Sequence, residues 1–276
     1  MNSIIKKNEE FVIVSTLGKQ IQSKNVLIAC GGFPKTEQYD WITNLGHTIE
    51  NPVPSLFTFN LPDNPITSLM GVSVKLVKVF LPELNLSYSG SLLITHWGLS
   101  GPVILKLSAF GARKLFELNY KYKISVNWLN EIKQNEVIQQ LINCKQQFPK
   151  KIIQNYCPFN QFPERLWHYF LQQCDADPRL NWADVSNKLI YKLAEIITNS
   201  IYHAEGKTTY KEEFVTAGGI KLKEIDMKTM ESKLISGLYF SGEILNVDGI
   251  TGGFNFQHAW SSGYIAGCSI GLKLDE

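Results

Sequence analysis

The chain has 276 residues, of which 44% are hydrophobic, 12% aromatic and 19% charged, and its formal net charge is +2. This composition is typical of a folded globular protein and excludes a disordered or collagen-like chain. Because Lys and Arg form no long block, we expect no surface dedicated to nucleic acid, which requires clustered cations.

Two short runs rich in β-branched residues open the chain, FVIVST at residues 11–16 and NVLIACGG at residues 25–32. The glycine-containing turn between them predicts a pair of strands. The second run is apolar from Val26 to Cys30, which is typical of a strand covered on both faces by helices, and we expect Cys30 in the core. From Pro52 to about Asn130, strand-like runs separated by turns predict an antiparallel barrel or sandwich.

The hydrophobic period changes from two to 3.6 after residue 130. Apolar residues at 137, 138, 141 and 142 share one helical face, Pro163 can begin a second helix, and Ser186 can cap a third. These features predict a small helical subdomain. Strand character returns in EEFVTAGGI and in GLYFSGE, so the order of elements predicts an α/β domain interrupted by a two-part insertion.

The last of these strands leads into a glycine-rich stretch, GEILNVDGITGGFNFQHAWSSGYIAG, at residues 242–267. Thr251, Gly252 and Gly253 would open a helix whose free backbone N–H groups favour electron-rich oxygen and nitrogen atoms. Since Gly252 and Gly253 lack a Cβ, a flat ligand could approach the backbone closely. The alternative is a tight strand-to-helix turn whose glycines serve packing alone, and the spacing leaves both interpretations open.

The longer stretch SKLISGLYFSGEILNVDGITGGFNFQHAWSSGYIAG resembles the C-terminal FAD motif of the bacterial BaiN-like flavoproteins, also called aminoacetone oxidase family FAD-binding enzymes. LIACGGFPKT, LGHTIENPVPSLFTF, LLITHWGLSGPVILKLS, FVTAGGI and TMESK resemble further parts of that family in the same order. The resemblance implies an FAD-dependent oxidoreductase of α/β class with an α+β insertion. In such a protein a Rossmann-type FAD-binding domain is interrupted by a β-barrel and a helical subdomain.

The family begins with a strand, a G-x-G-x-x-G turn and a helix that hold the ADP half of FAD, and no such turn occurs in these 276 residues. We therefore expect a partial FAD-binding domain, the C-terminal part of a flavoprotein, that is inactive as an isolated chain. The domains implied by the resemblance are residues 1–51, part of the FAD-binding domain; 52–129, the β-barrel insertion; 130–203, the helical insertion; 204–220, a return strand of the barrel; and 221–276, the C-terminal part of the FAD-binding domain.

The resemblance also implies contacts to the cofactor. Glu243 would lie against the ribityl or pyrophosphate region, and the start of the last helix would lie beside the flavin N1 and C2 carbonyl, where backbone donors stabilise negative charge. Thr216 to Gly219 would line the substrate side. The implied cofactor-binding residues are Gly31, Gly32, Gly242, Glu243, Gly252, Gly253, Phe254 and Asn255.

Some of these residues have plainer interpretations. Glu243 could be a loop carboxylate that caps a turn, and Gly31 and Gly32 could be an ordinary strand-ending turn. Two features differ from the family: FPKTEQYDW follows Gly32 where many members have a Gly- and Ser-rich loop, and Asn246 occupies a position that is often acidic.

The catalytic acid and base are unknown from the sequence. His96 and His258 are candidates by residue type, with a structural role as the alternative for each. The chemistry would belong mainly to FAD, which would accept hydride from an unidentified small organic molecule. The alternative function is a non-catalytic binding or interaction module that has lost the nucleotide site.

The cysteine pattern bears on the compartment. Five cysteines are widely spread without a C-x-x-C pair, so we expect reduced, mostly buried thiols, no metal site and a cytoplasmic protein. Two windows at 85–105 and 249–272 lack Asp, Glu, Lys and Arg, but their polar residues argue against membrane spans.

Overall fold

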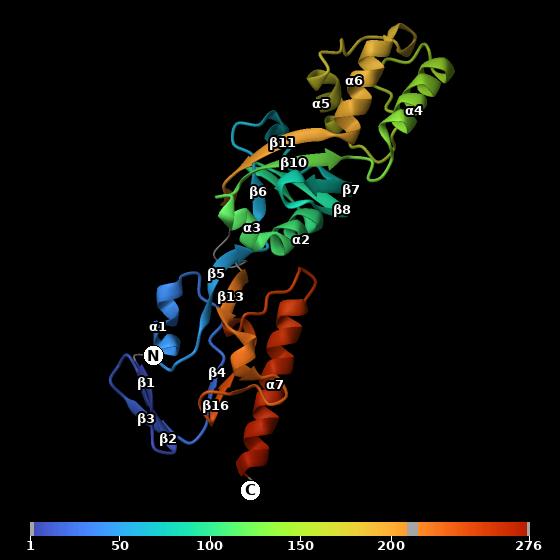
Figure 1. The fold of residues 1–276 in the computed structure, drawn as a ribbon. Helices are drawn as coiled ribbons and strands as arrows, with labels where there is room; N and C mark the ends of the chain where they lie inside the picture. Colours follow the sequence, from blue (N-terminus) through green and yellow to red (C-terminus); the bar gives the residue numbers. More distant parts are fainter. Residues whose placement is uncertain (1–2, 209–214, 275–276) are drawn as a thin grey trace. The chain divides into compact units, whose positions relative to one another are not determined.

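The computed structural model describes residues 3–208 and 215–274, and the chain divides into two compact units (Figure 1). Unit 1 combines residues 1–55 with residues 211–276, and unit 2 is the continuous segment 56–210. Separate clusters of buried hydrophobic side chains lie among residues 57–204 and among residues 4–42 and 220–266. The expected mixed α/β class, with a barrel-like sheet and helices in the middle of the chain, is confirmed.

Unit 2 contains a seven-stranded antiparallel sheet in the order β11-β10-β7-β8-β9-β6-β12. The strand-like runs of the sequence within residues 52–130 form strands here, because their apolar residues alternate toward the core. The strands are β6 (Thr58–Asn60), β7 (Ser73–Leu81), β8 (Leu86–Thr95), β9 (Gly98–Ser100), β10 (Lys121–Asn127), β11 (Ser200–Glu205) and β12 (Lys207–Thr208).

The α-helices of unit 2 form two groups in the sequence, one between β9 and β10 and one between β10 and β11. The three helices predicted after residue 130 are confirmed, and Ser186 caps the third by accepting a hydrogen bond from the Leu189 N–H at 3.2 Å. A helical pair between β9 and β10 was not predicted. The α-helices are α2 (Pro102–Phe110), α3 (Ala112–Glu117), α4 (Gln134–Gln147), α5 (Glu164–Gln173) and α6 (Asn187–Thr198), and the 3-10 helices are η2 (Pro65–Leu69), η3 (Pro82–Leu84) and η4 (Trp182–Asp184).

Unit 1 begins with a three-stranded antiparallel meander, of which the sequence predicted one strand. Farther along, a strand from each of its two chain segments joins in an antiparallel pair, β13-β5, with Ser55 opposite Val215. The elements are β1 (Ser3–Lys7), β2 (Glu10–Val14), β3 (Gln20–Ser23), η1 (Thr36–Tyr39), α1 (Asp40–Thr43), β5 (Ile49–Ser55) and β13 (Val215–Ile220).

A four-stranded sheet in the order β14-β15-β16-β4 completes unit 1, together with the long helix α7. β16 and β4 are parallel, with Leu238 opposite Val26 and Phe240 opposite Ile28. The elements are β4 (Val26–Ile28), η5 (Leu222–Glu224), β14 (Ile225–Asp226), β15 (Glu231–Ser232), β16 (Leu238–Phe240), η6 (Gly242–Ile244) and α7 (Phe254–Leu274).

The surroundings of β4 correct one prediction. All three residues of β16 are buried, but in β4 only Ile28 is buried and Leu27 is 38% exposed. Cys30 is exposed as well, not part of the core. The expectation that this run is covered on both faces is wrong for the described residues, because the face of β4 that carries Leu27 is left partly uncovered by them.

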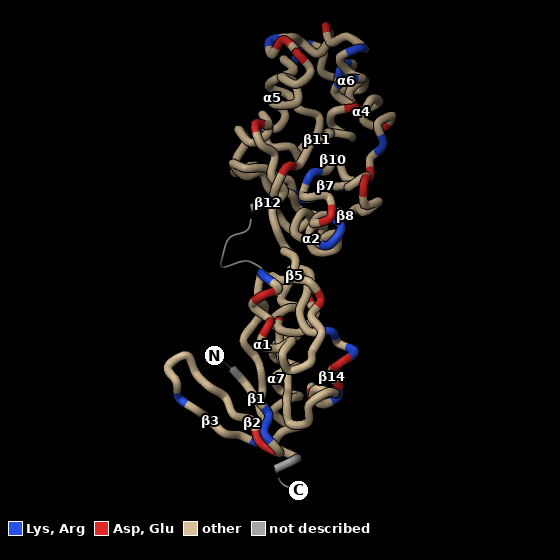
Figure 2. Tube along the Cα trace, turned by 60° about the vertical axis from the view of Figure 1, so that its left-hand side comes forward, with Lys and Arg blue, Asp and Glu red and all other residues tan. Residues whose placement is uncertain are grey.

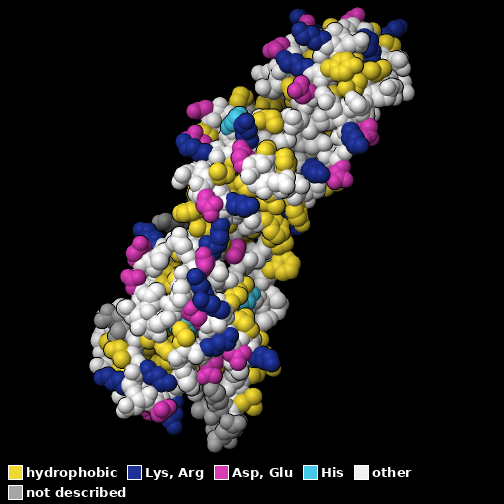
Figure 3. Space-filling view, viewed as in Figure 1, with side chains coloured by type: hydrophobic (Ala, Val, Ile, Leu, Met, Phe, Trp, Pro, Cys, Tyr) yellow, Lys and Arg dark blue, Asp and Glu magenta, His cyan; other side chains and the backbone are white. Residues whose placement is uncertain are grey.

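Charged side chains of both signs are interspersed along the chain (Figure 2). On the face drawn in Figure 3, Lys and Arg likewise alternate with Asp and Glu. Across residues 3–208 and 215–274, no helix is both long enough and apolar enough to cross a membrane.

Candidate functional site

The ends of β4 and β16 lie at the same edge of the sheet because these two strands are parallel. Gly31 and Gly32 follow β4, and Gly242 and Glu243 follow β16. A Cβ placed on Gly32 would lie 3.1 Å from the Glu243 Cγ and 3.2 Å from the Thr216 Cβ. The fold therefore brings the predicted residues Gly32 and Glu243 together with the start of β13.

Glu243 is half-buried, and its Oε1 accepts a hydrogen bond from the Thr216 N–H at 2.8 Å. This bond ties η6 to β13, which agrees with the interpretation of Glu243 as a loop carboxylate. A carboxylate offers about four lone-pair sites, so one such bond does not exhaust its capacity to accept. Glu243 can hold the protein and a ligand hydroxyl at the same time.

Tyr39, which sequence reasoning missed, lies close to this cluster. Its ring is fully buried and its hydroxyl oxygen accepts a hydrogen bond from the Phe33 N–H at 2.9 Å. Burial raises the pKa of Tyr39, the Phe33 N–H opposes this, and the negative charge of Glu243 raises the pKa further. Tyr39 therefore stays protonated at neutral pH, and the hydrogen bond from Phe33 fixes the position of its ring.

The glycines before α7 have backbone conformations that other residues rarely adopt. Gly252 has φ +123° and Gly253 has φ +89°, and a Cβ on Gly253 would meet no atom within 4 Å. The first helical hydrogen bond of α7 runs from the Gln257 N–H to the Gly253 carbonyl at 2.9 Å. The N–H groups of the first turn of this helix therefore lack intrahelical acceptors, and the space beside Gly253 is open.

Asn255 holds the loop that precedes α7. Its Oδ1 accepts from the Gly249 N–H at 2.7 Å, and its Nδ2 donates to the Gly249 carbonyl at 3.0 Å. We call this pair of bonds the Asn255 clamp. Because both side-chain atoms of Asn255 are engaged in it, the expected cofactor contact of this residue would be made by its backbone N–H.

The second and third turns of α7 anchor the helix on η6. His258 Nε2 lies 3.3 Å from the Gly242 carbonyl oxygen, and Ser262 Oγ accepts from the Gly242 N–H at 3.0 Å. The spacing of four residues between His258 and Ser262 could have indicated Ser262 from the sequence, since such residues share one helical face. These contacts hold α7 against Gly242, which follows β16. His258 lies about 7.5 Å along the helix from Gly253, so the start of α7 is close to this anchor.

The glycines of β13 serve packing. Gly218 and Gly219 have φ +145° and +119°, and a Cβ on Gly219 would lie 2.5 Å from the Ile244 carbonyl oxygen. Thr216, at the start of this segment, is only 2% exposed. The segment Thr216–Gly219, expected on the substrate side, is thus buried against β5 and η6.

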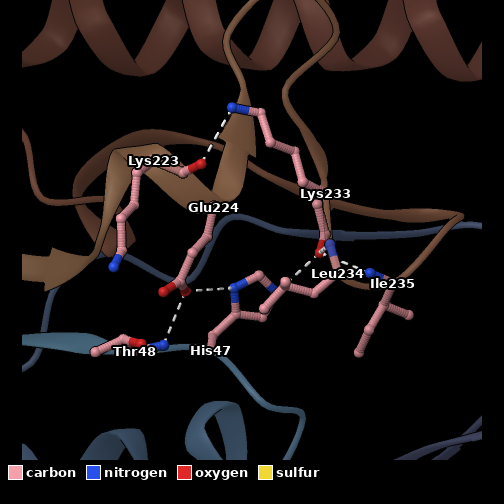
Figure 4. Close-up of polar contacts among 8 residues, drawn as sticks. His47, Thr48, Lys223, Glu224, Lys233, Leu234 and Ile235 are labelled. Carbon is pink, nitrogen blue, oxygen red and sulfur yellow. Dashed lines mark hydrogen bonds and ion pairs between the residues drawn. The ribbon is translucent and has the colours of Figure 1, made fainter.

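A second polar cluster lies inside unit 1 and resembles a Ser-His-Glu arrangement (Figure 4). His47 Nδ1 lies 3.2 Å from Glu224 Oε2, and His47 Nε2 lies 3.0 Å from Ser232 Oγ. Ser232 Oγ also accepts from the N–H groups of Leu234 and Ile235, each at 3.0 Å. The Ser232 hydroxyl therefore donates its proton to His47 Nε2, so that Nδ1 carries the imidazole proton and donates it to Glu224.

This second cluster is structural rather than catalytic. Its three side chains are buried, and the two lone pairs of Ser232 Oγ are already used as acceptors. Burial lowers the pKa of His47 despite the hydrogen bond and charge of Glu224, which keeps the imidazole neutral. Burial alone would raise the pKa of Glu224, but hydrogen bonds from Thr48 and His47 leave it lowered.

The two histidines considered from the sequence lie in different units. His258 is in unit 1, where it anchors α7, and His96 is an exposed residue of unit 2 in the turn between β8 and β9. The ring centroid of His96 lies 3.6 Å from that of Trp97. In the part of the chain that the structure describes, no group of three or more His, Cys, Asp or Glu side chains could hold a metal ion.

Comparison of the sequence with known proteins finds a match to one protein family. Its model, described as HI0933-like protein barrel and H2TH domain, matches residues 53–215, which is more than half of the chain. A ribosomal RNA dihydrouridine synthase of Haemophilus influenzae is 30% identical over 274 residues, 96% of this chain and 65% of the relative. A 3-dehydro-bile acid delta(4,6)-reductase of Clostridium scindens is 25% identical over 271 residues, 95% of this chain and 66% of the relative.

A ribosomal RNA dihydrouridine synthase of Escherichia coli is 31% identical over 196 residues, 71% of this chain and 46% of the relative. The chain thus spans slightly less than two thirds of the length of the first two relatives. The match to the family model establishes that the chain belongs to the HI0933-like family.

Proposed function

We propose that this chain forms the flavin-contacting part of an FAD-dependent oxidoreductase. The observation that carries the proposal is the start of α7, where a Cβ on Gly253 would meet no atom within 4 Å and the N–H groups of the first turn have no intrahelical acceptor. Family membership supports the proposal, because the relatives named above are a reductase and two dihydrouridine synthases.

The residues at this site fit a flavin. A Cβ on Gly31 or on Gly253 would meet no atom within 4 Å, so a planar ring could come close to the backbone at both places. The N–H groups at the start of α7 would donate to the electron-rich N1 and C2 carbonyl of the ring, and the helix dipole would favour negative charge there. Glu243 would accept from a ribityl hydroxyl while it holds the Thr216 N–H. Bound FAD would supply hydride-transfer chemistry.

We further propose that the reaction reduces a carbon–carbon double bond conjugated with a carbonyl group. Both kinds of relative support this class, since a dihydrouridine synthase adds hydrogen to a uracil ring and a delta(4,6)-reductase acts on a dehydro-bile acid. The direction is opposite to the expectation from the sequence, in which the flavin accepts hydride from a small substrate. The sequence led us to expect a small-molecule substrate, whereas the name of the Haemophilus relative indicates uridine in ribosomal RNA. The substrate experiment described below compares these two classes.

A flavin titration of the 276-residue chain tests the cofactor assignment. Binding is followed by the change in fluorescence. We expect FAD and riboflavin to bind with similar dissociation constants, in the range of about 10 μM to 1 mM, because the proposed contacts are to the flavin half alone. Gly253→Val should weaken both at least tenfold, because a branched residue resists φ +89° and fills the space beside the donors. His258→Ala should keep binding within about threefold, since its ring bonds to the protein.

Three results would contradict these assignments. Affinity for FAD that is far above that for riboflavin would place contacts to the ADP half within this chain. Absence of binding by the folded chain at millimolar flavin would favour the non-catalytic module. If folded Gly253→Val bound flavin as well as the wild-type chain does, the interpretation in which these glycines serve packing alone would be favoured.

Because the isolated chain is expected to be inactive, the substrate class is tested anaerobically in saturating reduced FAD with the chain fused to the third of the Haemophilus relative that it does not match. Reoxidation of the flavin on addition of a uracil-containing ribosomal RNA fragment, of a steroid dienone, or of a saturated alcohol as the control would separate the substrate classes. We expect reoxidation by a conjugated carbonyl compound and none by the alcohol. Reduction of oxidised FAD by a small alcohol or amine would instead support hydride acceptance.

A further inference from the structure

Aromatic rings lie next to basic side chains at two places on α2 and α3, which are neighbours in unit 2 (Figure 1). At the first place, Phe110 is 58% exposed and its ring centroid lies 6.1 Å from that of Tyr88. Lys106 donates from Nζ to the Tyr88 hydroxyl at 3.1 Å, and its ammonium lies 4.7 Å from the centre of the same ring. This first group therefore presents an exposed ring beside a cation that is held over an aromatic face.

The second group lies at the end of α3. Phe116 is 43% exposed, and its ring centroid lies 6.3 Å from that of Tyr120. The Lys207 ammonium lies 5.1 Å from the centre of the Tyr120 ring. Burial lowers the pKa of Lys207, so water solvates this ammonium incompletely. An anionic ligand would therefore meet a cation that has already lost part of its competing hydration.

Tyr120 has a backbone conformation that a bulky residue rarely adopts. Its φ is +56°, in the left-handed region that glycine adopts without strain. Its N–H donates to the Leu115 carbonyl at 2.9 Å, and its ring lies edge-to-face with that of Phe57. Strained backbone of this kind is concentrated at binding sites. The Tyr120 ring is thus fixed at the cost of strain, and Phe116 and Lys207 lie beside a rigid support.

The two units differ in charge. Unit 2 contains sixteen Lys and Arg and eleven Asp and Glu, a net charge of +5, whereas unit 1 contains eleven and fourteen, a net charge of −3. Residues 102–120, which contain α2 and α3, hold three basic residues and one acidic residue. The net charge of the whole chain, from which we expected no nucleic-acid surface, is therefore the sum of two opposite charges. A strongly unequal division of charge along a chain is typical of proteins that bind nucleic acid.

We define the α2–α3 surface as Tyr88, Lys106, Phe110, Phe116, Tyr120 and Lys207, and we propose that it binds single-stranded RNA. Unpaired bases stack on exposed aromatic rings, and cations beside such rings bind the phosphates. The rings of Phe110 and Phe116 would stack on bases, while Lys106 and Lys207 would bind phosphates. The proposal rests on the proposed function and deepens it, because it selects RNA from the two substrate classes that the names of the relatives give.

Fluorescence anisotropy of a labelled, uracil-rich single-stranded RNA of about 12 nucleotides tests the proposal, with the 276-residue chain in the absence of flavin. Phe110→Ser combined with Phe116→Ser should weaken binding at least tenfold, because two stacking rings are lost. Lys207→Gln should weaken binding at least threefold. It should also reduce the slope of the logarithm of affinity against that of salt concentration by about 0.7, because one phosphate contact is lost.

Matched controls come from α6 of the same unit. Tyr191 is a 57% exposed aromatic residue and Lys188 is an exposed cation, and both lie outside the α2–α3 surface. Tyr191→Ser and Lys188→Gln should each keep the affinity for RNA within about twofold of the wild-type value, because neither removes a proposed contact. Circular dichroism checks that each variant is folded.

The outcomes separate this proposal from the proposed function. Weaker RNA binding in the ring variant and in Lys207→Gln, with both controls unchanged, supports the α2–α3 surface whether or not the chain binds flavin. Absence of RNA binding by the folded wild-type chain, or unchanged binding by either folded variant, overturns it even if the chain binds flavin. Equal affinity for a duplex of the same sequence would also overturn it, because paired bases cannot stack on side chains. So would equal affinity for a poly-glutamate peptide, because an acidic protein would then be the partner.

Discussion

Removal of the Asn255 clamp should loosen the loop before α7 without unfolding unit 1. Asn255→Ala deletes the bonds at 2.7 and 3.0 Å to the backbone N–H and carbonyl groups of Gly249. Two such bonds stabilise by about 1–3 kcal/mol together. Alanine returns up to about 0.7 kcal/mol through its higher helix propensity. We therefore expect the free energy of unfolding to fall by about 0.3–3 kcal/mol.

The local effect should exceed the global one. Hydrogen exchange of the amides in residues 247–254, followed by mass spectrometry, should accelerate by about 5- to 150-fold if the loop opens independently. Gln257→Ala is the control, since it removes an exposed bond from Gln257 Nε2 to Ser261 Oγ in the same helix, and should change stability by less than about 0.5 kcal/mol. Unchanged exchange in Asn255→Ala would show that the glycine backbone alone fixes this loop, and the reasoning would be wrong.

Two further predictions concern stability. The lowered pKa of His47 means that the unfolded chain takes up this proton at higher pH than the folded chain, so stability is full above pH about 6.5 and falls as the pH drops below it. Thermal melts at pH 7.5 and 5.5 should show a smaller loss for His47→Gln than for wild type, and an equal loss would contradict the neutral-imidazole assignment. Ser186→Ala should lower the free energy of unfolding by about 0.5–2 kcal/mol in denaturant titrations, because the Leu189 N–H loses its acceptor, and an unchanged midpoint would argue against this cap.

Local patterns were sufficient for much of the fold. Strands β7, β8 and β10 and helix α6 follow from alternation, helical period and the Ser186 cap, all of which are properties of a few adjacent residues. The short polar strand β3 has no such pattern, since it becomes a strand only through its pairing with β2. The exposure of Leu27 could not be predicted either, because burial depends on which elements lie beside β4.

In the candidate site, too, some features follow from local sequence and others depend on segments that are far apart in the chain. Glycines before a helix are visible in the sequence, and their positive φ at 252 and 253 agrees with the need for glycine there. The contact of Glu243 with Thr216 and the position of Tyr39 arise from segments far apart in the chain, and no local spacing indicates them. The assignment of all eight residues, Gly252 and Gly253 included, to a cofactor stays a prediction, as do the domain boundaries.

The pairing of β5 with β13 has a consequence for the order of folding. These strands flank residues 56–210, so unit 1 can close only after its two segments meet across the whole of unit 2. As a random coil, that intervening segment would impose a large loop-closure entropy and slow the reaction, whereas once folded it acts as a short rigid connector. Unit 2 is continuous and can fold as soon as it leaves the ribosome, while β13, β16 and α7 are synthesised after it. Unit 1 therefore assembles after unit 2 has been synthesised, and we expect its rate of folding to depend on substitutions in the core of unit 2.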